Sequence, residues 1–380
     1  MESVVFVNML RQITRKRPGA KRLIVRMSDP ADYRAVEKAV ARTLSSVRPL
    51  PLIRAFSCRG TLSSAFLRRF GGRISIEEDT PLFVHAFPAQ GVGLPVSSDR
   101  LSSPFVPPGI RELRVPAVWK RSLGDRVRIG VIDTGVDFLH PDLTPSLARG
   151  INLINPRTLP YDDNGHGTHV AGTIAAAGSH GMTGIAPHAE LLPVKAFDHR
   201  GTAYVSDIVK AIDWCVQQGV DIINMSFGMK HRSESMLEAV RNARRRGVVI
   251  VASSGNDGRR GFIDYPARFP QTISVGAIDG KGRIAPFSNR GQRIDVYAPG
   301  ENVLSTWPKG RYYEMNGTSM ATAHVTGILA LVKSARPGLT PRQLKRIVAA
   351  AQVPLPGLRT KKTRYPGRID ALRAFRQLRK

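Results

Sequence analysis

The sequence contains several polar side chains that could carry out acyl transfer, and Ser319 is the first of them. It begins an apolar helical run in "NGTSMATAH", residues 316–324, where a serine is either a helix cap or a nucleophile. A catalytic serine needs a base, a group that orients the base, and a donor to an oxyanion. A catalytic role for Ser319 therefore depends on finding those three groups elsewhere in the chain.

A histidine and an aspartate could supply the base and its orienting group. His166 lies between two glycines at the start of a helical run in "DDNGHGTHVAGT", where little backbone crowding lets its side chain face a cleft. Asp133 ends the apolar run "VRIGVID", and a carboxylate at the end of a buried strand needs a partner. A histidine can take a hydroxyl proton near neutral pH, while a carboxylate fixes its tautomer and stabilises the imidazolium.

Other interpretations of these residues carry less weight. The triplet Asp-Thr-Gly at Asp133 also suits a turn or an aspartic protease, but the chain has one such triplet and that protease needs two carboxylates sharing a proton. His169 could pair with His166 on a metal, yet the glutamate of the H-E-x-x-H pattern is absent, so we expect His169 to pack against the sheet. Asn256 follows the run "VVIVASSG" and is either a turn former or an oxyanion donor.

The elements that must position these residues alternate along the second part of the chain. Apolar strand-like runs are separated by helical runs, which is typical of a parallel sheet covered on both faces. The strand-like runs are "VRIGVID", "AELLPVKAF", "VDIINMSFG", "VVIVASSGN" and "TISVGAID". Ligands of such sheets bind beyond the carboxyl ends of the strands, where Asp133 and Asn256 lie. The sequence predicts an α/β fold.

Ahead of this region, residues 21–87 are predicted to form a small α+β unit that ends in the strand "PLFVHAF". Residues 88–102 follow as a linker rich in Pro, Gly and Ser, which is an exposed and easily cut composition. The chain carries 57 Lys and Arg against 29 Asp and Glu, a net charge of +28. Such a charge favours anionic partners, but the basic residues are dispersed and no nucleic-acid motif is present, so we expect no specific nucleic-acid binding.

The motifs together resemble the subtilisin family of serine proteases over residues 103–375. The resemblance is carried by "VIDTGVD", "NGHGTHVAGT", "INMSFG", "SSGND" and "NGTSMATAHVTG", in the chain order Asp, His, Asn, Ser. It implies a subtilisin-like three-layer fold with a central, mostly parallel sheet and helices on both faces, over residues 103–380. It also implies that residues 21–87 are an inhibitory, ferredoxin-like propeptide, and that the protein is a self-inhibited precursor.

The same resemblance assigns roles to individual residues of a serine endopeptidase. Ser319 would attack the peptide carbonyl, with His166 as general base and acid, Asp133 as orienting group and Asn256 in the oxyanion hole. One wall of the substrate cleft would be Ser226, Phe227 and Gly228, and the opposite wall Ala252, Ser253, Ser254 and Gly255. Asp264 would form the floor of the first specificity pocket and favour lysine or arginine.

The resemblance also bears on processing, metal and partners. Arg100 is the expected processing site, because a cut after Phe87 would leave Pro88 next to the broken bond. No cofactor is expected to be required, and calcium is doubtful because the loop "AAAGSHGMTGIAP" is altered, although Asp142 is kept. We expect protein or peptide substrates, the intramolecular propeptide as a partner, and a monomer.

Two expectations concern location and an alternative function. The N-terminus is a poor secretory signal and no run reaches the ~18 apolar residues of a spanning helix. A cytoplasmic protein is then expected, or a secreted one if the start codon is misassigned. The alternative function is an inactive protease scaffold that binds nucleic acid or anionic surface polymers through its basic charge.

Overall fold

A nine-stranded sheet forms the centre of the larger part of the molecule. The computed structural model describes residues 3–14, 20–61, 64–88, 96–97, 104–356 and 366–379. The strand order is β19-β20-β16-β15-β14-β12-β8-β10-β9, and the pairs are parallel except β19 with β20. The strands are β8 (Arg128–Asp133), β9 (Ile151–Asn152), β10 (Glu190–Lys195), β12 (Ile222–Met225), β14 (Val249–Ser253), β15 (Ile273–Ile278), β16 (Val296–Pro299), β19 (Gln352–Val353) and β20 (Arg368–Ile369).

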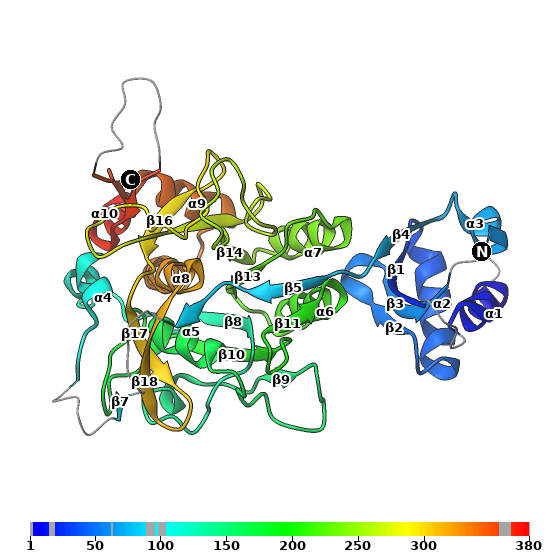
Figure 1. The fold of residues 1–380 in the computed structure, drawn as a ribbon, viewed down its shortest axis with the longest axis horizontal. Coiled ribbons are helices and arrows are strands. Elements are labelled where there is room, and N and C mark those ends of the chain that lie inside the picture. Colours follow the sequence, from blue (N-terminus) through cyan, green and yellow to red (C-terminus); the bar gives the residue numbers. More distant parts are fainter. Residues whose placement is uncertain are drawn as a thin grey trace.

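Helices cover both faces of this sheet, as Figure 1 shows. One apolar core joins α5 and α8 to strand residues such as Ile129 and Val131. A second core joins α6 and α7 to residues that point the other way, such as Ile223 and Ile250. The helices are α4 (Pro108–Glu112), α5 (His166–Ala175), α6 (Val205–Gln217), α7 (Glu234–Arg245), α8 (Thr318–Ala335), α9 (Pro341–Ala350) and α10 (Ala371–Gln377), with short 3-10 turns η3 (Val115–Val118) and η4 (Thr144–Ser146). The predicted three-layer α/β fold is confirmed.

A hairpin leads the chain into α8 and so determines where Ser319 lies. Strands β17 (Val303–Trp307) and β18 (Arg311–Asn316) pair antiparallel, and α8 starts two residues after β18. The hairpin is attached to α5 through His169, whose Nε2 lies 2.9 Å from the Val303 carbonyl and 3.0 Å from that of Tyr313. His169 is therefore a packed residue of the kind expected from its position.

The N-terminal unit, residues 3–79, is a separate four-stranded antiparallel sheet with helices on it. Its strands are β1 (Lys21–Met27), β2 (Arg48–Leu50), β3 (Ala55–Gly60) and β4 (Ile74–Glu78), in the order β2-β3-β1-β4. The helices are α1 (Ser3–Ile13), α2 (Pro30–Thr43) and α3 (Ser64–Phe70), with a 3-10 turn η1 (Pro51–Ile53). Apart from α1, this is the βαββαβ connectivity of a ferredoxin-like unit.

The predicted start of the unit at residue 21 leaves out a helix that belongs to it. The ring of Phe6 in α1 lies 5.5 Å from that of Phe66 and 5.0 Å from that of Phe70. Phe6, Val7 and Leu10 are all buried in the core of the unit. The apolar stretch at the N-terminus is therefore one face of an amphipathic helix.

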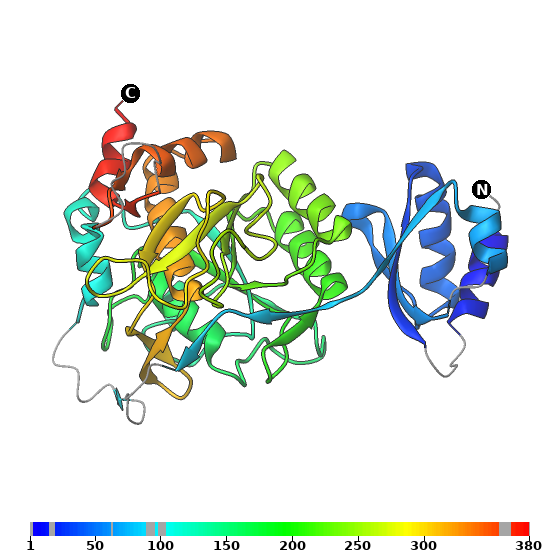
Figure 2. The same ribbon diagram turned by 45° about the horizontal axis from the view of Figure 1, so that its top comes forward.

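The strand "PLFVHAF" forms, but it does not join the sheet of the N-terminal unit as predicted. Residues 80–88, here called the cleft segment, leave that unit and cross the larger part of the molecule, as Figure 2 shows. Within it, β5 (Pro81–Val84) pairs with β11 (Thr202–Tyr204) and β13 (Phe227–Gly228), and β6 (Phe87–Pro88) pairs with β18. Leu82 is 1% exposed and packs in the core of the main sheet, which explains why the apolar run lies there.

Two further predictions concern the linker and the membrane. Within the predicted linker 88–102, the described residues Val96–Ser97 form β7, which pairs with β18. In the described part of the chain no helix combines the length and the apolar character needed to cross a bilayer.

The buried His169 predicts a pH-dependent stability. Burial lowers the pKa of His169 to about 3, so the folded chain keeps it neutral where the unfolded chain, with a pKa near ~6.5, binds a proton. Stability therefore falls as the pH drops below that value. In urea unfolding of the Ser319→Ala chain, the free energy of unfolding should fall between pH 7 and pH 5. This fall should be smaller by about 1–2 kcal/mol when His169→Gln is added.

The control for this measurement is His199→Gln at an exposed histidine, which should leave the pH dependence unchanged. If the free energy of unfolding of the His169→Gln chain depended on pH as before, the assignment of a neutral His169 would be contradicted.

Candidate active site

Asp133 and His166 meet where β8 ends and α5 begins. The His166 Nδ1 atom lies 2.6 Å from Asp133 Oδ1, and each side chain is 1% exposed. This contact sets the tautomer, because a ring nitrogen that donates to a carboxylate leaves the other nitrogen as an acceptor. That nitrogen, Nε2, has no hydrogen-bond partner among the described residues. His166 is thus oriented and its Nε2 can accept a proton.

A buried network that sequence reasoning missed holds this pair in place. Thr134 donates its backbone N–H to Asp133 Oδ1 at 2.8 Å and accepts the Gly167 N–H on its hydroxyl at 2.9 Å. The carboxylate of Asp162, 1% exposed, accepts from the Thr134 hydroxyl, the Gly165 N–H and the Thr168 N–H, each at 2.8 Å. Asp162 therefore couples the end of β8 to the first turn of α5. The sequence signal that could have identified Asp162 is its position in the motif "DDNGHGT", four residues before His166.

Ser319 lies in the first turn of α8 and is fully buried. Helices α5 and α8, which begin at His166 and at Thr318, pack against each other. The Ser319 hydroxyl donates to the backbone carbonyl of Ser226 at 2.8 Å. The hydroxyl is therefore turned to the cleft wall rather than hydrogen-bonded to the histidine.

Asn256 lies beside the same helix start. Its Oδ1 accepts the Thr318 N–H at 3.0 Å and the Thr318 hydroxyl at 2.9 Å. A backbone N–H can only donate, so this pair fixes the amide with its NH2 group on the opposite side. The Asn256 Nδ2 atom is therefore the end that can bond to a ligand.

The cleft segment lies beside Ser319 as an extended peptide. The His85 N–H donates to the Ser226 carbonyl at 3.1 Å, and the Ser319 N–H donates to the His85 carbonyl at 3.3 Å. A Cβ atom at position 317 would lie 2.3 Å from that carbonyl oxygen, so this close approach requires Gly317. His85 is thus the residue whose carbonyl group faces the candidate nucleophile.

The predicted walls of the cleft flank this peptide. Phe227 and Gly228 form β13, which pairs with Val84 and Phe83. On the other side the Ser253 hydroxyl lies 2.8 Å from His85 Nδ1, and the Asp264 carboxylate lies 3.0 Å from His85 Nε2. The remaining predicted wall residues, Ala252, Ser254 and Gly255, lie at the end of β14 and beyond it.

Acidic side chains of the N-terminal unit fix the cleft segment at its upstream end. Glu77 accepts the Ser235 N–H at the start of α7 at 2.9 Å, and Asp79 accepts the Ser206 N–H at the start of α6 at 2.9 Å. Carboxylates are favoured at these positions because the first N–H groups of a helix are unpaired and carry partial positive charge. Arg22 adds an ion pair to Asp79 at 2.9 Å. The unit is therefore docked on two helix ends.

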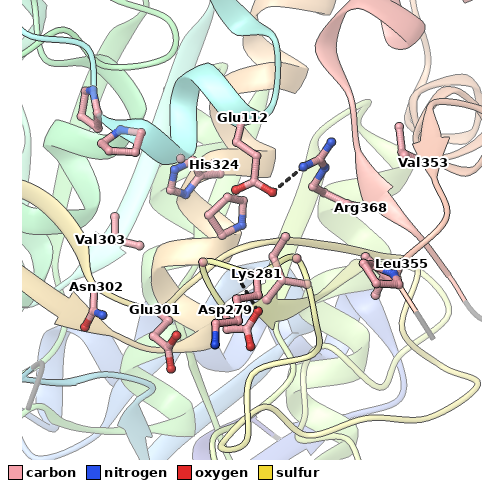
Figure 3. Close-up of a pocket in the computed structure, with 18 of the residues that line it drawn as sticks. Glu112, Asp279, Lys281, Glu301, Asn302, Val303, His324, Val353, Leu355 and Arg368 are labelled. Carbon is pink, nitrogen blue, oxygen red and sulfur yellow. Dashed lines mark hydrogen bonds and ion pairs between the residues drawn. The ribbon is translucent and has the colours of Figure 1, made fainter. Parts of the chain in front are cut away.

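A cavity of about 750 Å3 lies elsewhere, between α4 and the end of the main sheet. Figure 3 shows His324 and the ion pair of Glu112 with Arg368 among its lining residues. His324 Nδ1 donates to the Met320 carbonyl at 2.8 Å, and burial lowers the pKa of His324 to about 4. Asp133, His166 and Ser319 are not among the residues that line this cavity.

Asp142 is retained in the sequence although the expected calcium loop is altered. Its Oδ1 accepts the His180 N–H at 2.7 Å, and its Oδ2 accepts the Met182 N–H at 2.7 Å and the Tyr312 hydroxyl at 2.6 Å. Both oxygens thus face hydrogen-bond donors, which do not fit a cation. Among the described residues no group of three or more His, Cys, Asp or Glu side chains is arranged to hold a metal ion.

Arg100, the predicted processing site, lies outside the described residues. The structure brings Asp133 and His166 into contact and places Ser319, Asn256 and Asp264 around the cleft segment. His85 was not singled out from the sequence, and its place in an apolar strand gave no signal of a role. Only the pairing of the cleft segment shows which residue faces Ser319.

Comparisons with known proteins find similar chains over the larger part of the molecule. Residues 124–367 match the Subtilase family. The chain is 42% identical over 246 residues to subtilisin E of Bacillus subtilis (strain 168), covering 63% of this chain and 64% of that protein. It is 42% identical over 246 residues to subtilisin of Bacillus pumilus, covering 63% and 89%, and 43% identical over 242 residues to M-protease of Shouchella clausii (strain KSM-K16), covering 63% of each. The chain thus spans less than two thirds of the length of subtilisin E and of M-protease.

The contacts of Asp142 predict stability without added metal. In the Ser319→Ala chain, Asp142→Asn should lower the free energy of unfolding by about 2–4 kcal/mol, because an amide NH2 would face the donors that the carboxylate now accepts from. Thermal unfolding of the Ser319→Ala chain should be the same with calcium and with a chelator. A calcium-dependent rise in Tm that disappears in Asp142→Asn, but not in the exposed control Asp125→Asn, would contradict this reading.

Proposed function

Because this chain belongs to the subtilase family, we propose that it is a serine endopeptidase made as a precursor that its own N-terminal unit inhibits. The observation that carries the proposal is the contact of the Ser319 N–H with the His85 carbonyl oxygen at 3.3 Å. A carbonyl held there is positioned for attack by the adjacent hydroxyl. The cleft segment is thus bound in the manner of a substrate.

The proposed reaction begins with attack of Ser319 Oγ on the peptide carbonyl carbon. The hydroxyl proton passes to His166 Nε2, while Asp133 holds the Nδ1–H and stabilises the imidazolium. The oxyanion is stabilised by the Ser319 N–H and the Asn256 amide. The C–N bond then breaks and His166 returns the proton to the leaving amine. Water releases the acyl group from Ser319 by the same steps in reverse.

The proposed reactive arrangement differs from the observed one in the direction of the Ser319 hydroxyl. The Ser319 hydroxyl donates to the Ser226 carbonyl at 2.8 Å, and the same carbonyl accepts the His85 N–H at 3.1 Å. Turning Ser319 about its Cα–Cβ bond would direct the hydroxyl toward His166 Nε2, which has no partner in the described chain. The precursor can therefore hold the peptide bond in place without cleaving it at once.

Substrates are proposed to be proteins or peptides bound as an added strand. The cleft segment pairs on both sides, with β11 and with β13, so its backbone supplies affinity whatever the sequence. Side chains then determine which sequences bind. The Leu82 side chain is 1% exposed and so contacts the protein closely, whereas the Phe83 side chain is 53% exposed. An apolar side chain is expected to be preferred in substrates at the position that Leu82 occupies. At the position that Phe83 occupies, many different side chains are expected to be tolerated.

The inhibitory role of the N-terminal unit rests on its contacts at both ends of the cleft. Glu77 and Asp79 bind the starts of α7 and α6, and on the far side of His85 the residues of β6 pair with β18. A segment held at both ends leaves the cleft slowly even after a bond in it is cut. Maturation would then require digestion of the N-terminal unit.

The catalytic roles can be tested by substitution. Ser319→Ala should abolish casein hydrolysis and covalent labelling by a fluorophosphonate. Asn256→Ala should lower kcat by about 100- to 1000-fold with little change in KM, a magnitude established on a subtilisin, because the amide acts on the transition state. Steady-state kinetics on a peptide substrate measure both effects.

The exposed Ser179→Ala variant serves as control and should behave as the unmodified chain. Casein hydrolysis that survives Ser319→Ala would refute the proposed nucleophile. Equal losses in Ser179→Ala would point to a general loss of folding.

A further inference from the structure

The His85 side chain fills a pocket whose polar groups match an imidazole. Its Nδ1 lies 2.8 Å from the Ser253 hydroxyl and its Nε2 lies 3.0 Å from Asp264 Oδ2. Ser253 and Asp264 are 0% and 1% exposed, and His85 itself is 8% exposed. A buried carboxylate and a buried hydroxyl are thus both directed at the same ring.

We propose that the precursor is cut between His85 and Ala86, and that the enzyme recognises histidine before the cut through Ser253 and Asp264. This inference rests on the proposed endopeptidase function and specifies its substrate. Hydrolysis would break the bond between the His85 carbonyl carbon and the Ala86 nitrogen, through an ester on Ser319. The serine proton leaves with the Ala86 amine, and water supplies the new His85 carboxylate.

The backbone of the cleft segment identifies the bond. His85 is held through its N–H by Ser226 and through its carbonyl by the Ser319 N–H. Two residues further on, Phe87 pairs with Asn316 of β18. The peptide therefore passes the nucleophile at a single register, with His85 on the acyl side and Ala86 on the amine side. A first cut after Arg100 would require these paired residues to leave the cleft.

The pocket accepts both protonation states of histidine. A neutral ring with its proton on Nε2 donates to Asp264 and accepts from the Ser253 hydroxyl on Nδ1. A protonated ring donates to both, because a hydroxyl oxygen also accepts. The pocket therefore suits an imidazole in either state, and its hydrogen bond to the Asp264 carboxylate is charge-assisted.

Lysine and arginine, which Asp264 suggested from the sequence, fit this pocket less well. Lys230 Nζ lies 3.1 Å from Asp264 Oδ1 and 3.0 Å from its Oδ2, and Asp257 pairs with Lys230. A second cation would have to share Asp264 with Lys230. A Cβ atom at position 228 would lie 2.3 Å from His85 Cε1, so Gly228 makes one wall flush with the ring. The imidazole of His85 already reaches Asp264 at 3.0 Å, and the side chains of lysine and arginine are longer than that of histidine.

The cut is tested by mass spectrometry of the full chain at early times after purification. We expect fragments that end at His85 and begin at Ala86. His85→Ala should slow their formation about 10- to 100-fold, as expected for loss of a hydrogen bond to a charged group. Arg100→Ala should leave the cut unchanged. A first new N-terminus at Leu101 that persists in His85→Ala would overturn the inference.

Recognition is tested with matched peptides that carry Leu-Phe-Val-His, Leu-Phe-Val-Arg or Leu-Phe-Val-Phe before Ala-Phe. The kcat/KM for the histidine peptide should exceed the others by about 10-fold or more. The ratio of kcat/KM for the histidine and phenylalanine peptides cancels effects on the catalytic residues, which act on both peptides. Asp264→Asn should lower this ratio, because an amide bonds the ring less strongly than a carboxylate.

The two proposals fail in distinguishable ways. Cleavage of all three peptides at equal rates, dependent on Ser319, would overturn the inference and leave the endopeptidase. A chain that reacts with a fluorophosphonate at Ser319 but divides elsewhere than at His85 would do the same. A chain that neither reacts nor cleaves any peptide would overturn both.

Discussion

The backbone N–H of Ser319 and the carbonyl oxygen of His85 lie 3.3 Å apart, and this contact constrains most of the molecule. The N–H lies at the positive end of α8. The residue between β18 and that helix must be glycine, because a Cβ atom at position 317 would lie 2.3 Å from the His85 carbonyl oxygen. The carbonyl must arrive at one register, which β11, β13 and β18 impose by pairing with the cleft segment on either side of it. A slip of one residue would turn each side chain to the opposite face. Leu82 would then be exposed and the pocket at Asp264 would receive a different residue.

Under the proposed function, inhibition and catalysis would use the same contacts in this arrangement. The strands that would bind a substrate bind the chain's own segment, and the helix ends that receive Glu77 and Asp79 keep it there. The buried pair of Asp133 and His166 is already formed, held by a network of donors around Asp162. The Ser319 hydroxyl alone points away, toward a carbonyl of the cleft wall. A preformed site needs little reorganisation when that hydroxyl turns, which is the advantage of fixed dipoles around a reacting group.

The fold and the candidate catalytic side chains were largely accessible from the sequence, because they depend on local patterns. Buried parallel strands read as apolar runs, and Asp133, His166 and Asn256 follow such runs or begin helices. The partners of the cleft segment were not accessible, since an apolar strand pairs equally well with any sheet edge and only tertiary packing selects one. The role of His85 was hidden for the same reason. Helix α1 is not predicted because its short apolar stretch also fits a targeting signal. The donors around Asp142 come from segments distant in sequence.

Residues 80–88 occupy the candidate catalytic cleft with the His85 carbonyl at the start of α8. A crystal structure of the full Ser319→Ala chain would test this placement, because the substitution removes the candidate nucleophile and keeps the backbone N–H. We expect continuous density through the cleft, with the His85 carbonyl oxygen within hydrogen-bonding distance of the residue 319 N–H and the Asn256 amide, and with the imidazole against Asp264. An empty cleft, or another residue in the pocket at Asp264, would contradict it.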